Sequence, residues 1–228
     1  MSNKTSLVLF DIDGTLMRGA GRPHRDALVE GIRKVTGRST TLEGIATAGA
    51  LDRDLIAIML RAAGESERRI RAVLREVMRE CEQTYVRNCT ADLSPFLCRD
   101  VGGILEDLKS RGAVLGLVTG NLSAIGWKKV ELAGLRSYFS VGAFAGDGRS
   151  RARVAKVAAQ RARRKGLATQ SSRISLIGDH ASDVAAAKAN GFQSVAVATG
   201  VLSREELAES QPDILVEHLG ELDLSKLL

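Results

Sequence analysis

The sequence is poor in aromatic residues, which make up only 4% of its 228 residues, with one Trp and two Tyr. Proteins that bind single-stranded nucleic acids stack the bases on aromatic side chains, and the Arg-rich stretch between residues 147 and 166 contains none. The net charge of +6 would suit an anionic partner such as a phosphate ester. We therefore do not expect nucleic acid to be the main partner.

The sequence also lacks a cysteine pattern and a long apolar run. Cys81, Cys89 and Cys98 are odd in number and form no Cys-x-x-Cys spacing, which argues against a disulfide framework and a zinc site. No apolar run approaches the length of a membrane span, and the N-terminal residues lead straight into an apolar segment without a signal peptide. We expect a cytoplasmic protein with reduced, partly buried thiols and no membrane partner.

The most informative feature present is the pentapeptide Asp11-Ile12-Asp13-Gly14-Thr15, directly behind the apolar residues 6–10. Such a run predicts a buried parallel strand, and open α/β sheets carry their chemistry at the carboxyl ends of their strands. Two carboxylates one residue apart repel each other unless a cation neutralises them, so the pattern favours a hard divalent ion. An ordinary acidic turn is the alternative interpretation.

Two further apolar runs end in polar residues. Residues 114–118 are followed by Thr119-Gly120-Asn121, where a hydroxyl and the N–H groups of a helix N-terminus suit a phosphoryl oxygen, although a simple turn and cap would use the same residues. Residues 174–177 are followed by Gly178-Asp179, with Asp183 four residues later at the start of a predicted helix. Two Asp at this spacing can reach one cation from a loop.

The order and spacing of these motifs resemble the signatures of the haloacid dehalogenase-like hydrolase superfamily. Residues 49–52, Gly-Ala-Leu-Asp, resemble a substrate-facing loop of its phosphoglycolate phosphatase-like members. The resemblance implies an α/β fold, with a Rossmann-like parallel sheet core in residues 1–17 and 89–228 and an inserted helical cap in residues 18–88.

The periodicity of apolar residues predicts the individual elements. The cap region carries helical patterns over 24–35 and 52–63, and a third after Ser66, a predicted N-cap. No strand of the main sheet is needed between residues 17 and 88. The remaining predicted elements are helices over 101–111, 121–133, 154–165 and 184–189, and strands over 138–144, 195–198 and 214–216.

The resemblance also implies roles for individual residues. Asp11 would be the nucleophile that forms an aspartyl-phosphate, and Asp13 the general acid and base. Asp11, the backbone carbonyl of Asp13, Asp179 and Asp183 would hold Mg²⁺ or support its ligands. Thr119 and one basic residue would neutralise the phosphoryl oxygens. Arg151 fits a Phe-Gly-x-Asp-x-x-x-Arg pattern of the family, whereas other members use a lysine that would correspond to Lys156.

The implied activity is Mg²⁺-dependent hydrolysis of a small phosphate ester, phosphoglycolate-like or a sugar phosphate. A phosphosugar mutase of the same fold, a nucleotide or nucleic-acid-end phosphatase and a non-catalytic binding module are the alternatives. The candidate substrate-binding residues are Gly120, Asn121, Arg18, Arg22, His24 and Arg53. His180 stands where many relatives have Thr or Ser, and we expect it to face solvent in a turn; contact with the ligands of the metal or with the substrate is the alternative. The sequence indicates no particular oligomeric state.

Overall fold

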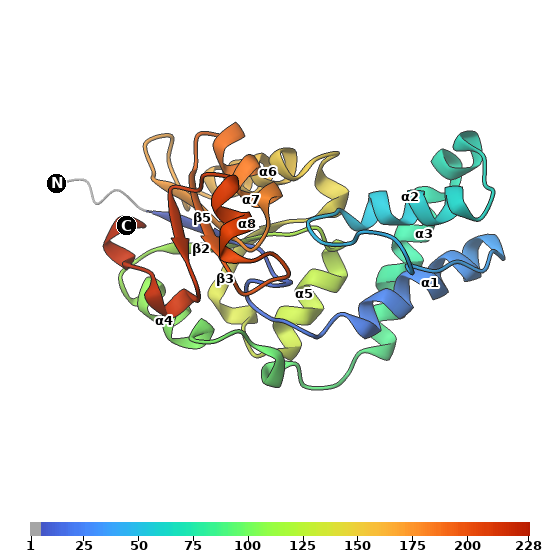
Figure 1. Ribbon diagram of the computed structural model, residues 1–228, viewed down its shortest axis with the longest axis horizontal. Coiled ribbons are helices and arrows are strands. Elements are labelled where there is room, and N and C mark those ends of the chain that lie inside the picture. The colour runs from blue at the N-terminus through green and yellow to red at the C-terminus, as the bar shows by residue number, and fades with distance from the viewer. Residues whose placement is uncertain (1–5) are drawn as a thin grey trace.

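A computed structural model describes residues 6–228 and contains a six-stranded parallel sheet (Figure 1). The strand order is β3-β2-β1-β4-β5-β6, with β1 at Leu7–Phe10, β2 at Val114–Val118, β3 at Phe139–Ala143, β4 at Ile174–Gly178, β5 at Gln193–Val197 and β6 at Ile214–Val216. This topology confirms the predicted Rossmann-like α/β core.

The sheet is covered on both faces because successive side chains of each strand point in opposite directions. Leu7 and Leu9 of β1 pack in one apolar cluster with α6 (Arg151–Arg164) and α7 (Ala181–Ala189). Val8 and Phe10 pack in a second cluster with α4 (Val101–Ser110) and with Val130 of α5 (Ser123–Leu132). The strand is therefore buried along its length, as a run without polar residues requires.

Three helices lie together at one end of the molecule, away from the C-terminus (Figure 1). They are α1 (Arg22–Thr36), α2 (Asp52–Ala62) and α3 (Glu67–Asn88), and they follow β1 in the chain without an intervening strand. The side chain of Ser66 accepts a hydrogen bond from the Arg69 N–H, so the predicted N-cap of α3 is confirmed. The three predicted helical patterns of the cap region are thus all formed.

The close packing of α1 against α3 depends on Gly31. A Cβ atom at this position would lie 2.9 Å from Cα and 2.8 Å from the backbone N of Cys81, distances that side chains do not tolerate. We expect Gly31→Ala to destabilise the protein by about 1–3 kcal/mol, because the helices must separate. Thermal unfolding would measure the loss.

A matched control is Gly103→Ala in α4, where a Cβ would meet nothing within 4 Å. There the substitution should stabilise by about 0.5–1 kcal/mol, since Gly costs conformational entropy inside a helix. Equal melting temperatures for the two variants would contradict the close packing of α1 and α3.

Several element boundaries differ from the sequence prediction. Helix α6 begins at Arg151 and not at residue 154, because the Ser150 side chain caps it by accepting from the Arg153 N–H at 3.2 Å. Helix α8 (Arg204–Glu209) was not predicted, although Ser203 and Glu206 form a capping box at its start. The expectation of partly buried thiols holds for Cys98 only, since Cys81 and Cys89 are buried. Among the described residues, no helix has the length and apolar character to cross a bilayer.

Candidate active site

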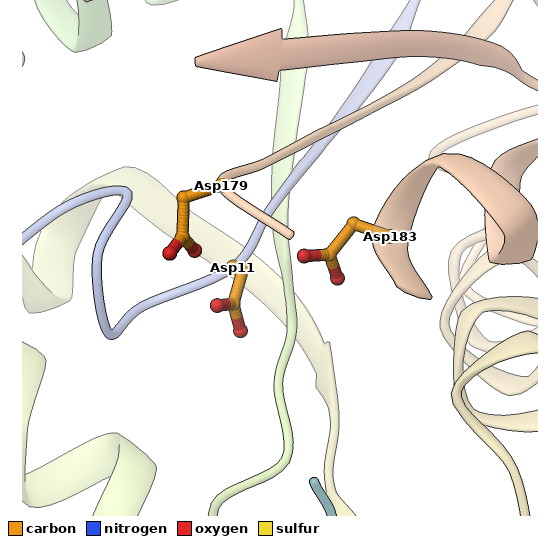
Figure 2. A group of neighbouring side chains, drawn as sticks. All are labelled: Asp11, Asp179 and Asp183. Carbon is orange, nitrogen blue, oxygen red and sulfur yellow. The ribbon is translucent and has the colours of Figure 1, made fainter. Parts of the chain in front are cut away.

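Three carboxylates from separate segments meet at the carboxyl edge of the sheet (Figure 2). Asp11 follows β1, Asp179 follows β4 and Asp183 lies in the first turn of α7. Strands β1 and β4 are neighbours in register, with Phe10 opposite Ile177, which brings the residues that follow them together. One oxygen of each carboxylate lies within 4.8 Å of the others, and all three residues are buried.

Gly14 makes this approach possible. Its backbone has φ +93°, in the left-handed region that favours glycine, and a Cβ atom there would overlap the Asp179 carboxylate. Thr15, one residue later, donates its hydroxyl hydrogen to Asp179 Oδ1 at 3.2 Å. The turn that ends the first motif therefore also positions the acidic residue of the last motif.

Arg151 lies against this carboxylate cluster. Its Nη1 is 3.2 Å from Asp11 Oδ1 and its Nε is 2.9 Å from Asp183 Oδ1, and its side chain is 8% exposed. Lys156, the alternative basic residue, is exposed on α6 one turn further along. Of the two candidates, only Arg151 is in contact with the carboxylates, because α6 starts early enough to include it.

The cluster contains more acidic than basic groups, so its charge favours the binding of a cation. Burial, together with the charges of the neighbouring carboxylates, raises the pKa of Asp11 from 3.8 to about 7, although Arg151 opposes the shift. The same two causes raise the pKa of Asp179 from 3.8 to about 8. Burial also raises the pKa of Asp183. Asp11 Oδ1 and both Asp183 oxygens are buried and accept no hydrogen bond, although Arg151 forms ion pairs with Asp11 Oδ1 and Asp183 Oδ1. Three clustered acidic groups that face a single arginine fit a hard divalent ion.

These pKa shifts predict how stability depends on pH and metal. The folded protein binds more protons than the unfolded chain between the ordinary pKa of 3.8 and the raised values of about 7 and about 8. In the presence of a chelator, the free energy of unfolding should therefore fall as pH rises through this window. Mg²⁺ at 100 times its Kd should add about 2.7 kcal/mol, or roughly 5–10 °C in Tm.

Differential scanning fluorimetry with MgCl₂ or EDTA, at about pH 5.5 and about pH 8.5, would measure both effects. The stabilisation by Mg²⁺ should be greater at the higher pH, because the cation then competes with fewer protons. A Tm that rises with pH in EDTA, or one that Mg²⁺ leaves unchanged, would contradict the arrangement of the cluster.

The second motif lies on the other side of Asp11. The hydroxyl of Thr119 accepts hydrogen bonds from the backbone N–H and from Nδ2 of Asn121, at 3.3 and 2.7 Å. Asn121 Nδ2 also donates to Asp13 Oδ2 at 2.7 Å. Asn121 thus connects the predicted phosphoryl-binding hydroxyl to the predicted acid and base.

Lys129 is a site residue that sequence reasoning missed. Its side chain is completely buried in α5, and its Nζ donates to both Asp13 oxygens at 2.7 Å. Desolvation opposes ionisation of Asp13, but the Lys129 charge and the hydrogen bonds from Lys129 and Asn121 outweigh it and lower the pKa. The available signal was the spacing: Lys129 stands between Ile125 and Leu132 on the apolar stripe of the helix.

A cavity of about 410 Å³ opens over the carboxylates. Of the predicted substrate-binding residues, four line it: Arg18, His24, Gly120 and Asn121. Arg25, which was not predicted, lines it as well. Arg22 borders a neighbouring hollow instead, and Arg53 points to the carbonyl oxygen of Gly148 at 3.5 Å and to Asp54 at 3.6 Å. The structure therefore does not place Arg22 or Arg53 among the residues that line this cavity.

The expectation of a solvent-facing His180 holds only in part. The imidazole caps α7 by accepting from the Ser182 N–H at 3.2 Å, and it is half-buried. Its ring lies against Gly49 so closely that a Cβ atom there would overlap it. The turn is covered because the loop before α2 reaches over the start of α7.

A sequence model described as haloacid dehalogenase-like hydrolase matches residues 5–191. Phosphoglycolate phosphatase from Escherichia coli strain K12 is 30% identical over 132 residues, which cover 58% of this chain and 52% of that protein. The chain thus spans about half the length of the curated relatives it matches.

Solved structures of low sequence identity share the fold. A predicted phosphatase from Clostridium acetobutylicum aligns with a TM-score of 0.67 at 19% identity, over 99% of each chain. A β-phosphoglucomutase from Clostridium difficile aligns with a TM-score of 0.65 at 18% identity, over 97% of this chain and 95% of that one.

Proposed function

Because this chain belongs to the haloacid dehalogenase-like hydrolase family, we propose that it is a Mg²⁺-dependent phosphatase of small phosphate esters. The observation that carries the proposal is the meeting of Asp11, Asp179 and Asp183 with Arg151 beneath one cavity. A dianionic ester would be repelled by a lone buried carboxylate. A cluster that combines a cation site with a fixed guanidinium group can accept it.

The proposed reaction has two steps. In the first, an oxygen of Asp11 attacks phosphorus, the bond from phosphorus to the ester oxygen breaks, and that oxygen takes a proton from the Asp13 carboxyl group. In the second, Asp13 takes a proton from water, the water oxygen attacks phosphorus, and the bond to Asp11 breaks to regenerate its carboxylate. The products are an alcohol and inorganic phosphate, and both carboxyl groups return to their starting state.

Several residues of the site would together stabilise the negative charge of the phosphoryl group. Asp11, Asp179 and Asp183 would hold Mg²⁺, which supplies positive charge to the phosphoryl oxygens when bound. Arg151 would contact phosphoryl oxygens of the substrate and keep the Asp11 carboxylate oriented. The Thr119 hydroxyl would donate to another phosphoryl oxygen. Asp13 in its ionised form is ready to accept a proton from water.

The proposed substrate is a small metabolite with a second anionic group, such as 2-phosphoglycolate. The cavity volume of about 410 Å³ suits a small molecule, and Arg18 and Arg25 add two guanidinium groups to its wall. The similarity to a phosphoglycolate phosphatase supports the same class. A sugar phosphate would fit the cavity volume equally well.

A phosphosugar mutase is the second candidate, because a β-phosphoglucomutase is among the structures with the same fold. In a mutase the phosphoryl group on Asp11 returns to the substrate, so isomerisation would occur without release of phosphate. The two functions therefore differ in a measurable product.

Two further proposals concern the domain organisation and the cellular location of the protein. We propose that residues 18–88, which contain α1, α2 and α3, act as a cap over a core of residues 1–17 and 89–228. We also propose a cytoplasmic location. The free thiols of Cys81, Cys89 and Cys98 support it, because thiols persist in reducing compartments.

A panel of phosphorylated metabolites, incubated with Mg²⁺ or with EDTA, would test the function. Phosphate release and product isomers should be measured together. We expect phosphate release from a small ester that stops when EDTA is added. Isomerisation without phosphate release would favour the mutase, and activity unchanged in EDTA would refute metal dependence.

A further inference from the structure

Lys129 is buried in an unusual setting for a lysine. Its side chain is 0% exposed, and burial of an ammonium group is costly unless its hydrogens are all bonded. Nζ has three hydrogens and three acceptors: both oxygens of Asp13 at 2.7 Å, and Nδ1 of His24 at 3.2 Å. Every hydrogen therefore has a partner, and two of the three point at the predicted acid and base.

The contact with Lys129 determines which ring nitrogen of His24 accepts a hydrogen bond. An ammonium group can only donate, so His24 Nδ1 must accept and carries no hydrogen. The hydrogen of the ring then lies on Nε2, which donates to Asp52 Oδ2 at 2.9 Å. The His24 ring also packs edge-on against Tyr85, with ring centroids 6.0 Å apart, so residues of all three cap helices meet here.

Asp52 connects this pair back to the core. Its Oδ2 also accepts from the backbone N–H of Leu122 at 2.7 Å, and its own N–H donates to the Gly120 carbonyl oxygen at 2.8 Å. Gly120 has no room for a side chain, because a Cβ atom would overlap the carbonyl oxygen of Ala50. The start of α2 is thus bonded to the same loop that carries Thr119 and Asn121.

The contacts form a continuous chain that leaves the core and returns to it. It runs from the Leu122 N–H to Asp52, then to His24, to Lys129 and to Asp13. Two of its members belong to the first turns of α1 and α2, and the others to the core. Asp13 has a side chain that is 42% exposed, yet Lys129 on one side and Asn121 on the other fix its orientation.

We propose that Lys129 is a positioning residue: its ammonium group aims the Asp13 carboxyl group at the leaving oxygen, and the His24–Asp52 pair holds that ammonium group in place while α1 and α2 lie against the core. The inference rests on the proposed function, since Asp13 is the proposed proton donor to the leaving oxygen. It concerns the orientation of the Asp13 carboxyl group and not its pKa, which the same lysine lowers. It also makes proton transfer dependent on the docked position of the cap helices.

The test compares two esters that differ in their need for a proton. The oxygen of p-nitrophenyl phosphate leaves as a stable anion, whereas an alkyl phosphate requires protonation of its leaving oxygen. The ratio kcat/KM reports the steps up to transfer of the phosphoryl group to Asp11, so it isolates this difference. Lys129→Met should lower kcat/KM for the alkyl ester about 100-fold or more, and for p-nitrophenyl phosphate less than about 10-fold.

Three further variants complete the design. Lys128→Met removes the neighbouring lysine, which pairs with Glu131 and lies outside the chain of contacts. It should leave kcat/KM unchanged for both esters. Lys129→Arg keeps two donors toward Asp13 and should recover part of the alkyl activity. His24→Phe keeps an aromatic ring but removes the acceptor for Lys129, and should show the same substrate selectivity with a smaller loss.

The outcomes separate the inference from the proposed function. Two results would overturn the positioning role. One is an equal loss of kcat/KM on both esters for Lys129→Met and His24→Phe. The other is a kcat/KM for the alkyl ester within about 3-fold of that of the unmodified protein. If thermal unfolding shows that Lys129→Met does not fold, His24→Phe decides. If the unmodified protein hydrolyses neither ester with Mg²⁺, the proposed function itself fails.

Discussion

Replacement of Asp11 by Asn should abolish Mg²⁺-dependent hydrolysis of phosphate esters, with a loss on the order of 10⁴-fold or more in kcat. An amide oxygen is a poor nucleophile toward phosphorus, so the first bond to the protein cannot form. Asn keeps the shape of the side chain and removes one of three mutually repelling carboxylates. The variant should therefore fold, and without metal it should be at least as stable as the unmodified protein.

Steady-state phosphate release and thermal unfolding would test this expectation together. Asp107→Asn, an exposed carboxylate on α4, is the matched control and should change neither. Quenching the unmodified enzyme in acid during turnover should also trap phosphate on the peptide that contains residue 11. Hydrolysis by Asp11→Asn at more than a few percent of the normal rate would remove Asp11 from its proposed role.

The second large effect is expected at Arg151. Arg151→Met should lower kcat/KM by about 10²–10³-fold, the typical cost of losing a preorganised charge at a developing anion. It should also lower stability, because Asp11 and Asp183 lose the cation that lies 3.2 and 2.9 Å from them. Mg²⁺ should recover part of this stability and little of the rate.

Two comparisons make the Arg151 result specific. Lys156→Met, on the exposed face of the same helix, should leave the rate unchanged. Arg151→Lys should be intermediate, since one ammonium group cannot contact both carboxylates as a planar guanidinium group does. A normal rate for Arg151→Met with a loss for Lys156→Met would reverse the choice between the two basic residues.

The strands and the residues that follow them could be predicted from the sequence. Residues 7–10, 114–118 and 174–177 are largely apolar runs, and each such run in a parallel sheet places the residues that follow it at the same edge. The positions of Asp11, Thr119 and Asp179 at that edge follow from this rule alone. Arg151 could be preferred over Lys156 only by its fit to a family pattern, because its contact with the carboxylates depends on the start of α6 directly after its N-cap, Ser150.

Contacts between elements far apart in the chain could not be predicted. Lys129 and Asp13 are 116 residues apart and His24 and Asp52 are 28 apart, and no periodicity within one helix encodes such a meeting. The half-buried position of His180 likewise depends on where the loop before α2 comes to rest. Arg53 was a plausible substrate residue until the orientation of α2 was known.

Local chemistry therefore determined the sheet, its acidic edge and the residues that stand at the ends of β1, β2 and β4. Only the docking of α1 and α2 against the loop of residues 119–122 decided which basic side chains line the cavity and what surrounds Asp13. The physical reason is range: turn residues, helix caps and apolar periodicity act over a few residues. A buried ammonium group, in contrast, is stabilised only by partners that tertiary packing brings to it.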